Sequence, residues 1–211
     1  MARPLIPFED YCRISRVIAA VLDAVDANTP RACLFFAIAG AHILRSVYRI
    51  NAVPMAGAAF YRVDEATGFT IAFGELDGGA AASHDHAFHC WLIADGFVID
   101  FMAPIFQSSA KAGGRTEKVP PRMLQKSLAN MAASPYELAA EGDFYLAPNL
   151  DLGMRLIEGW MRKPGNDDLV KICQYWYTKP PRPISPTLEI GSNDGLQIKA
   201  SLRPLILEGA W

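Results

Sequence analysis

The sequence predicts an α+β fold in which N-terminal helices pack on an antiparallel sheet. Two segments before residue 51 carry apolar residues in helical patterns, whereas the segments from 52 to 106 are short and β-prone. The dipeptide Asp95-Gly96 separates two of these short segments and favours the tight turn of an antiparallel hairpin. With 211 residues, the chain is long enough to bury a core within a single domain, residues 1–211.

The first predicted helix covers residues 9–26. Its apolar residues lie three or four positions apart and share one face: Ile14, Val17, Ile18, Val21, Leu22 and Val25. A second, alanine-rich helix follows, with Asn28 or Thr29 as its N-cap and Pro30 in its first turn. Cys33 therefore lies in the first turn of this helix or just beyond it.

The middle of the chain predicts two pairs of strands. Residues 56–63 and 69–76 are β-prone and are separated by the turn-forming sequence DEATG. Residues 87–94 and 97–106 form the second pair, around Asp95-Gly96. The antiparallel sheet of the predicted fold comes from these four runs.

The remainder of the chain combines a loop, helices and a hairpin. Residues 107–121 are polar and contain Gly and Pro, which predicts a surface loop. Helices are expected at 122–133, 151–162 and 167–177. Residues 188–202 have the pattern of a terminal hairpin.

The composition is that of an ordinary globular protein, with 51% hydrophobic residues and a formal charge of -2. No basic stripe favours nucleic acid, and no apolar run reaches membrane-spanning length. We expect a cytoplasmic protein that binds neither. The four cysteines are far apart and form no CxxC pair, which argues against a zinc knuckle or a redox dithiol; they are Cys12, Cys33, Cys90 and Cys173. Since we expect no signal peptide, we expect no disulfide framework either.

The register of the second hairpin places a histidine near a carboxylate. A two-residue loop pairs Ala94 with Phe97, and side chains alternate between the two faces from there. The residues on one face are His89, Trp91, Ile93, Val98, Asp100 and Met102. His89 and Asp100 are then diagonal neighbours, within reach of a hydrogen bond from Nδ1 to the carboxylate. Such a bond fixes the imidazole tautomer and makes the histidine useful as a base.

Cys33 is the candidate nucleophile for this base. The amide groups and positive dipole end of a helix N-terminus favour a thiolate, and Arg31 adds positive charge nearby. Cys90 points to the face opposite His89, so we expect it to pack in the core. Cys12 and Cys173 are expected to be structural as well, and Trp91 is expected to shield the bond between His89 and Asp100 from water.

The order of these features resembles the core of transglutaminase-like and papain-like cysteine enzymes. The features are a cysteine at a helix start, the segment LRSVYRINAVP followed by Gly57, the motif HxW, and a hydrophobic strand that ends in Asp. The chain is also similar to a small bacterial family of unknown function grouped with the cysteine-proteinase fold. The resemblance covers residues 31–102. It implies a catalytic core at about 28–105, with a C-terminal elaboration at about 122–211.

The resemblance implies that Cys33 is the nucleophile, His89 the base and Asp100 the residue that orients His89. The predicted function is that of a thiol-dependent hydrolase or acyltransferase, which acts on an amide or ester of a small molecule or peptide and needs no cofactor. Papain-like enzymes often use a glutamine upstream of the cysteine for the oxyanion hole, and no glutamine precedes Cys33. Backbone amides near Cys33 or another side chain would take that place. The oligomeric state is left open.

Two alternatives stand beside this prediction. His84 and His86 are spaced to share a strand face, which would suit a metal-binding β-protein. In that case they would be ligands, whereas in a cysteine enzyme they would lead into the strand or line the cleft. The other alternative is a catalytically inactive version of the fold that only binds a partner.

Overall fold

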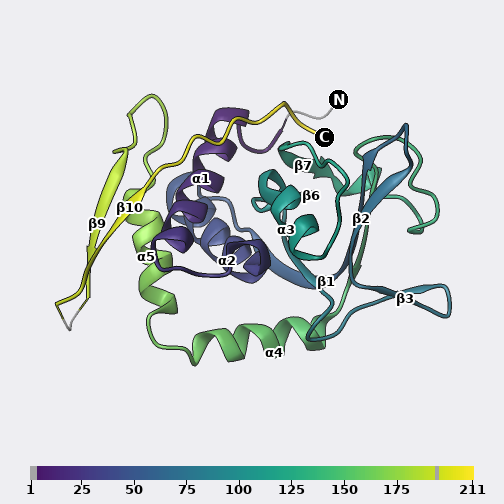
Figure 1. The fold of residues 1–211 in the computed structure, drawn as a ribbon, viewed down its shortest axis with the longest axis horizontal. Helices are drawn as coiled ribbons and strands as arrows, with labels where there is room; N and C mark the ends of the chain where they lie inside the picture. The colour runs from purple at the N-terminus through teal and green to yellow at the C-terminus, as the bar shows by residue number, and fades with distance from the viewer. Residues whose placement is uncertain (1–3, 193–194) are drawn as a thin grey trace.

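Helices gather beside a curled antiparallel sheet in the computed structural model, which describes residues 4–192 and 195–211 (Figure 1). The predicted α+β class is therefore confirmed at the level of a mixed fold with an antiparallel sheet. Within the described ranges, no helix has the length and apolar character needed to cross a membrane.

The two predicted N-terminal helices form, but the second begins later than the predicted N-cap at Asn28 or Thr29, because Pro30 lies in a separate 3-10 turn. Helix α1 spans Phe8–Ala24, and its apolar face is buried. A 3-10 turn, Thr29–Arg31, precedes helix α2, which spans Cys33–Ile43 and continues into a π-helical turn at Leu44–Tyr48. Cys33 is thus the first residue of α2.

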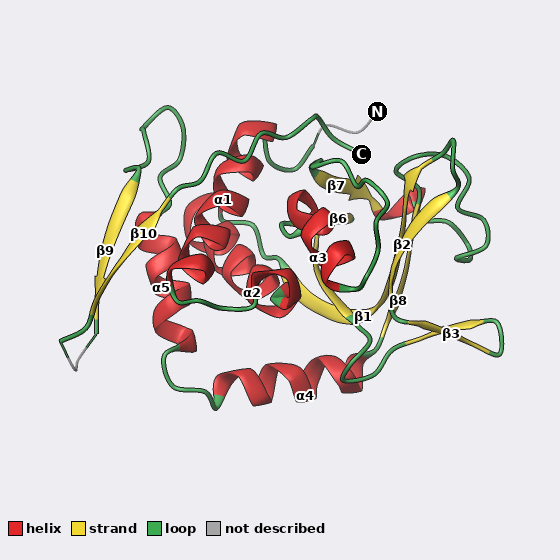
Figure 2. Cartoon of the chain, in the orientation of Figure 1, coloured by secondary structure: helices red, strands yellow, loops and turns green. Residues whose placement is uncertain are grey.

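The main sheet is antiparallel throughout (Figure 2). Its strands are β1 Val53–Asp64, β2 Phe69–Phe73, β5 His89–Ala94, β6 Phe97–Asp100, β7 Leu124–Ser127 and β8 Phe144–Pro148. Their order is β2-β1-β5-β6-β7, and β8 also pairs with β1. The long strand β1 therefore joins the two predicted pairs of strands into one sheet.

The hairpin of β5 and β6 has the predicted register. Ala94 pairs with Phe97, and Ile93 pairs with Val98. Asp95 and Gly96 have φ angles of 47° and 77°. Positive φ at both central residues is the signature of the type I′ turn, whose twist matches that of the flanking strands.

The run predicted as one strand at residues 69–76 is interrupted at Gly74. Gly74 has a φ of 133°, and a Cβ atom there would lie 2.6 Å from the Cβ of Ala58. The chain bends at this close approach and continues as β3, Glu75–Asp77, which pairs with β4, Ala80–Ala82. The two short strands form a small separate hairpin that projects from the sheet (Figure 1).

Two predictions between residues 107 and 133 are wrong. The first part of the expected loop is helix α3, Phe106–Ala112, because Phe106 and Ala110 are buried against the core. The expected helix at 122–133 is instead strand β7 followed by a 3-10 turn, Leu128–Asn130. The open edge of β6 accepts β7 and supplies its backbone hydrogen bonds, and this pairing outweighs a local helical pattern.

The C-terminal helices and hairpin are confirmed. Helix α4 spans Leu150–Met161 and helix α5 spans Asn166–Trp176. Strands β9, Thr187–Gly191, and β10, Gln197–Ser201, form the hairpin. Residues 193 and 194 in its connection lie outside the described part of the chain. The hairpin lies beside α1 and α5, on the far side of the helices from the main sheet (Figure 1).

Helix α2 packs directly on β5, and this contact positions the site. A Cβ atom on Gly40 would lie 2.4 Å from Cδ2 of Phe101 and 3.3 Å from Cδ1 of Leu92, so a larger residue there would force neighbouring side chains to shift. Most buried apolar residues, from Ile6 to Ala200, belong to one continuous core cluster. The first turn of α2 is thereby held over the beginning of β5.

Candidate active site

Cys33 lies at the N-terminus of α2 with little exposure to solvent. Its exposed fraction is 6%, and Ala32 provides the N-cap position. Ala32 is also the C-cap of the preceding 3-10 turn, and its N–H donates to the carbonyl oxygen of Thr29. The predicted placement of Cys33 at a helix start is confirmed.

His89 and Asp100 make a buried hydrogen bond across the hairpin. The distance from Nε2 of His89 to Oδ2 of Asp100 is 2.5 Å, and the residues are 0% and 2% exposed. The predicted pair forms, but through Nε2 rather than through the predicted Nδ1. The two residues are diagonal neighbours, and at that separation the carboxylate meets the far nitrogen of the ring.

Further hydrogen bonds fix the Asp100 carboxylate. The backbone N–H of Met102 donates to Oδ1 at 3.0 Å, and the hydroxyl of Tyr61 donates to Oδ2 at 3.4 Å. The hydroxyl of Tyr11 donates to the backbone carbonyl of Asp100. Asp100 is therefore held from its side chain and its main chain, and it sets the orientation of the imidazole.

The second nitrogen of His89 is left for Cys33. Nδ1 is buried and has no hydrogen-bond partner among the described residues, and Cys33 and His89 lie close enough for each to shift the pKa of the other. Burial acts to lower the pKa of His89, but the charge and hydrogen bond of Asp100, with help from Cys33, raise that pKa to about 10. The arrangement favours an imidazolium beside a thiolate.

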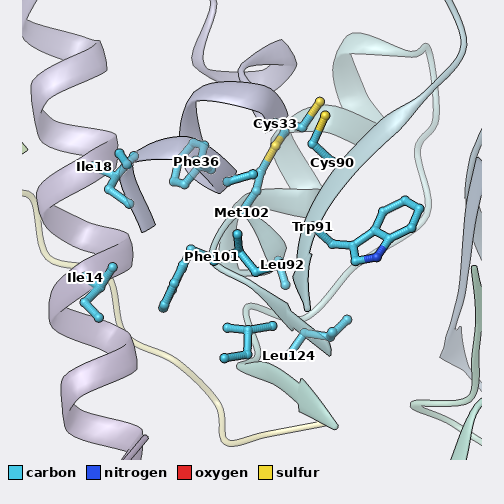
Figure 3. Close-up of a cluster of buried hydrophobic side chains, with 14 of the residues drawn as sticks. Ile14, Ile18, Cys33, Phe36, Cys90, Trp91, Leu92, Phe101, Met102 and Leu124 are labelled. Carbon is cyan, nitrogen blue, oxygen red and sulfur yellow. The ribbon is translucent and has the colours of Figure 1, made fainter. Parts of the chain in front are cut away.

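Cys90 takes part in this arrangement, which the sequence did not predict. A hydrogen bond with Cys90 is the largest cause that lowers the pKa of Cys33, and contact with His89 lowers it further against the opposing effect of burial. Burial and the bond to Cys33 raise the pKa of Cys90. Figure 3 shows the two sulfur atoms side by side. Side chains alternate along β5, so Cys90 points to the face opposite His89, as predicted. That face packs against α2, whose first residue is Cys33.

Aromatic rings enclose the imidazole of His89. Phe73 stacks on it with ring centroids 4.3 Å apart, and Phe106 and Tyr61 meet it edge to face at 5.5 Å and 6.2 Å. Among the described residues, these rings, and not the predicted Trp91, are the aromatic contacts of His89. Trp91 is buried and points away from Cys33 and Cys90 (Figure 3). No sequence spacing identifies Phe73 or Phe106, because they come from separate elements.

A cavity of about 530 Å³ adjoins this aromatic enclosure. Phe73 forms part of its wall and also stacks on His89, and Phe88 in the wall directly precedes His89. Other parts of the wall come from β2, from the segment 85–88 and from α3 and the residues after it. A volume of this size suits a small organic ligand.

His84 and His86 lie in a tight turn and do not share a strand face as predicted. His84 forms an isolated bridge with Ala87, and Nε2 of His84 lies 3.0 Å from Oε1 of Glu75. The backbone N–H of His86 donates to Nδ1 of His84. Within the described ranges, no group of three or more His, Cys, Asp or Glu side chains is placed to hold a metal ion.

Comparison with known proteins identifies a family and a similar solved structure. A family model described as "Protein of unknown function (DUF2026)" matches residues 7–211. A solved structure entitled "The crystal structure of genomics APC5867" is 32% identical, with a TM-score of 0.87 over 100% of this chain and 99% of that chain. Among curated proteins no match is found.

Proposed function

The chain belongs to the DUF2026 family, and we propose that it is a thiol-dependent hydrolase or acyltransferase that acts on an amide or ester. The observation that carries the proposal is the environment of His89. Its Nε2 is bonded to Asp100 at 2.5 Å, while its Nδ1 is left for Cys33, whose pKa is lowered. Acyl chemistry at a cysteine requires a nucleophile next to a base, and a carboxylate that orients the base.

The first half of the proposed reaction forms a thioester. The Sγ thiolate of Cys33 attacks the substrate carbonyl carbon, a C–S bond forms, and the π electrons move to the carbonyl oxygen. When the C=O bond re-forms, the bond to the leaving nitrogen or oxygen breaks. The leaving group takes the proton from Nδ1 of His89, and Asp100 stabilises the imidazolium until then.

The second half releases the acyl group. Water or an amine attacks the thioester carbon and gives its proton to Nδ1 of His89. The C–S bond then breaks, and the thiolate and imidazolium are both restored. Water gives hydrolysis, and an amine gives acyl transfer.

Backbone amides at the start of α2 are the proposed oxyanion donors. The first N–H groups of a helix have no partner within the helix, and Cys33 contributes the first of them. This replaces the upstream glutamine of papain-like enzymes, which the sequence lacks. We propose that the fold itself is a transglutaminase-like or papain-like cysteine-proteinase domain spanning residues 1–211.

The proposed substrate is a small molecule or peptide with an amide or ester bond, and the proposed location is the cytoplasm. All four cysteines are free thiols, as suits a reducing compartment.

The direct test is alkylation of the native protein with iodoacetamide between pH 5 and 9, with the adduct mapped by peptide mass spectrometry. An ordinary thiol is only a few per cent ionised at pH 7. We expect Cys33 to react about tenfold faster than such a thiol at that pH, since its lowered pKa keeps it as thiolate. The protein should also hydrolyse p-nitrophenyl acetate, and Cys33→Ala should abolish both activities.

Cys12→Ser serves as the matched control, because Cys12 is half-buried in α1 and its pKa is raised by burial to about 11. This variant should keep the wild-type rate. If Cys33 in the folded protein reacts no faster than a free thiol, the chain is a binding version of the fold and the proposed chemistry is wrong.

A further inference from the structure

The cavity beside His89 has a cationic rim, made by two arginines from different elements. Arg31 ends the 3-10 turn that leads into α2, two residues before Cys33. Arg115 follows α3, and its backbone N–H donates to the carbonyl of Ala110 in that helix. Because α3 packs against the Thr29–Arg31 turn, both arginines reach the same cavity.

The charge of this rim is not neutralised by the protein. No ion pair involves Arg31 or Arg115 within the part of the chain that the structure describes. The only carboxylate in the described lining is that of Asp85, and it pairs with Arg155 of α4 at 3.3 Å. His86 is the remaining titratable group in the lining. The positive end of the α2 dipole has the same sign as the two guanidinium groups.

One part of the cavity wall is apolar. Its apolar side chains come from β2, from the segment before β5 and from α3: Phe69, Ile71, Phe73, Phe88 and Ala110. An apolar wall with a few charged groups at one place is typical of a site that binds an organic ligand in a fixed orientation. Phe73 connects this wall to the catalytic candidates, since its ring stacks on His89.

We propose that this cavity binds the acyl part of the substrate and that Arg31 and Arg115 recognise a carboxylate on it. The substrate class is then an amide or ester of an acid that has an aromatic or aliphatic body and a second, free carboxylate. Guanidinium groups match a carboxylate in charge and geometry. The inference rests on the proposed function, because the cavity adjoins the candidate triad through Phe73, which stacks on His89, and does not itself include Cys33.

Binding is tested first, without turnover. The probes are 3-phenylpropionate and its neutral analogue 3-phenylpropionamide, titrated by ligand-observed NMR into Cys33→Ala, which cannot hydrolyse the amide. We expect the carboxylate to bind about threefold to tenfold more tightly than the amide, as for partly exposed charge pairs, and this preference should fall with added salt. Adding Arg31→Gln or Arg115→Gln should remove most of the preference.

Arg162→Gln is the matched control, since Arg162 follows α4 outside the cavity and is exposed, with an ion pair to Glu158 at 3.5 Å. It should leave the preference unchanged. An amide that binds as well as the carboxylate, absence of binding by either probe at 10 mM, or equal weakening of both probes in the two arginine variants would each overturn the inference.

Turnover is tested with mono-p-nitrophenyl glutarate and p-nitrophenyl butyrate on the enzyme with Cys33 intact. We expect the anionic ester to have a KM about threefold to tenfold lower, and Arg115→Gln to raise only that KM while kcat stays within twofold. If neither ester is hydrolysed but the carboxylate still binds through the arginines, the proposed function fails and the binding inference stands. If both esters are hydrolysed with equal KM, the inference fails and the proposed function stands.

Discussion

Only one of the two ring nitrogens of His89 is bonded within the described structure, and this division is the basis of the proposed site. Nε2 binds Asp100, and Nδ1 remains for Cys33. The sequence predicted these three residues, because a hairpin register and a helix start are both local patterns. It predicted Nδ1 rather than Nε2 as the nitrogen that meets the carboxylate, and it did not predict that Cys90 would lie beside Cys33 and lower its pKa. Those facts depend on ring rotation and on where α2 meets β5.

The role of Cys90 gives a prediction at the scale of one residue. Replacing Cys90 by Ala removes the hydrogen bond that contributes most to the lowered pKa of Cys33. A hydrogen bond to a charged group is worth about 1.5–3 kcal/mol, so the pKa of Cys33 should rise by about 1–2 units. Since only the thiolate reacts, the pH at which alkylation reaches half its plateau rate should move upward by the same amount.

The control for this prediction keeps a donor at the same position. Cys90→Ser replaces the thiol by a hydroxyl, so the midpoint of the pH profile should stay near that of the wild type. An unchanged profile in Cys90→Ala would mean that Cys90 only packs in the core, as the sequence first indicated.

At the scale of elements, local sequence patterns predicted the helices that are amphipathic and the strands that are joined by short turns. The helix at residues 9–26 and the hairpin around Asp95-Gly96 are of this kind. The predicted helix at 122–133 was wrong, because the secondary structure of this segment depends on a neighbouring strand. The edge of β6 pairs with residues 124–127 and makes them a strand. A segment's own sequence does not reveal such a neighbour.

The contact between α2 and the sheet gives a prediction about an element. Gly40→Ala adds a methyl group at 2.4 Å from the ring of Phe101, which overpacks the interface at a cost of about 1–3 kcal/mol. This exceeds the gain in helix propensity of about 1 kcal/mol. The net result should be a lower free energy of unfolding in urea, together with slower alkylation of Cys33 because α2 is displaced.

Gly159→Ala in α4 is the matched control. A Cβ atom on Gly159 meets nothing within 4 Å, so only the propensity term applies and the variant should be stabilised by up to about 1 kcal/mol. Equal stabilisation of the two variants would show that the close approach at Gly40 does not constrain α2.

At the scale of the whole molecule, β7 connects segments from both ends of the chain. The side-chain amide of Gln125 bonds to the N–H and the carbonyl of Ile6, both at 3.0 Å. The backbone of Met123 bonds to Gly209 at 2.9 Å and to Trp211 at 3.0 Å. The N-terminal and C-terminal segments thus close over the same edge of the sheet.

This connection predicts that Gln125 supports the whole fold. Gln125→Ala would leave two backbone groups of the buried residue Ile6 without partners, at a cost of about 2–4 kcal/mol in the free energy of unfolding. Urea denaturation followed by tryptophan fluorescence measures it. Gln197→Ala, at an exposed position in β10, should change that free energy by less than about 0.5 kcal/mol. Similar small effects in both variants would contradict the prediction.

The sequence by itself determined the helix start at Cys33 and the hairpin that pairs His89 with Asp100, because both follow from spacing and turn geometry within a few residues. Only the tertiary structure decided that Cys33 meets His89 and Cys90, that β7 forms at the sheet edge, and that Arg31 and Arg115 share one cavity. These contacts join segments far apart in the chain. They depend on how closely α2 and α3 pack against the sheet, which no local pattern specifies.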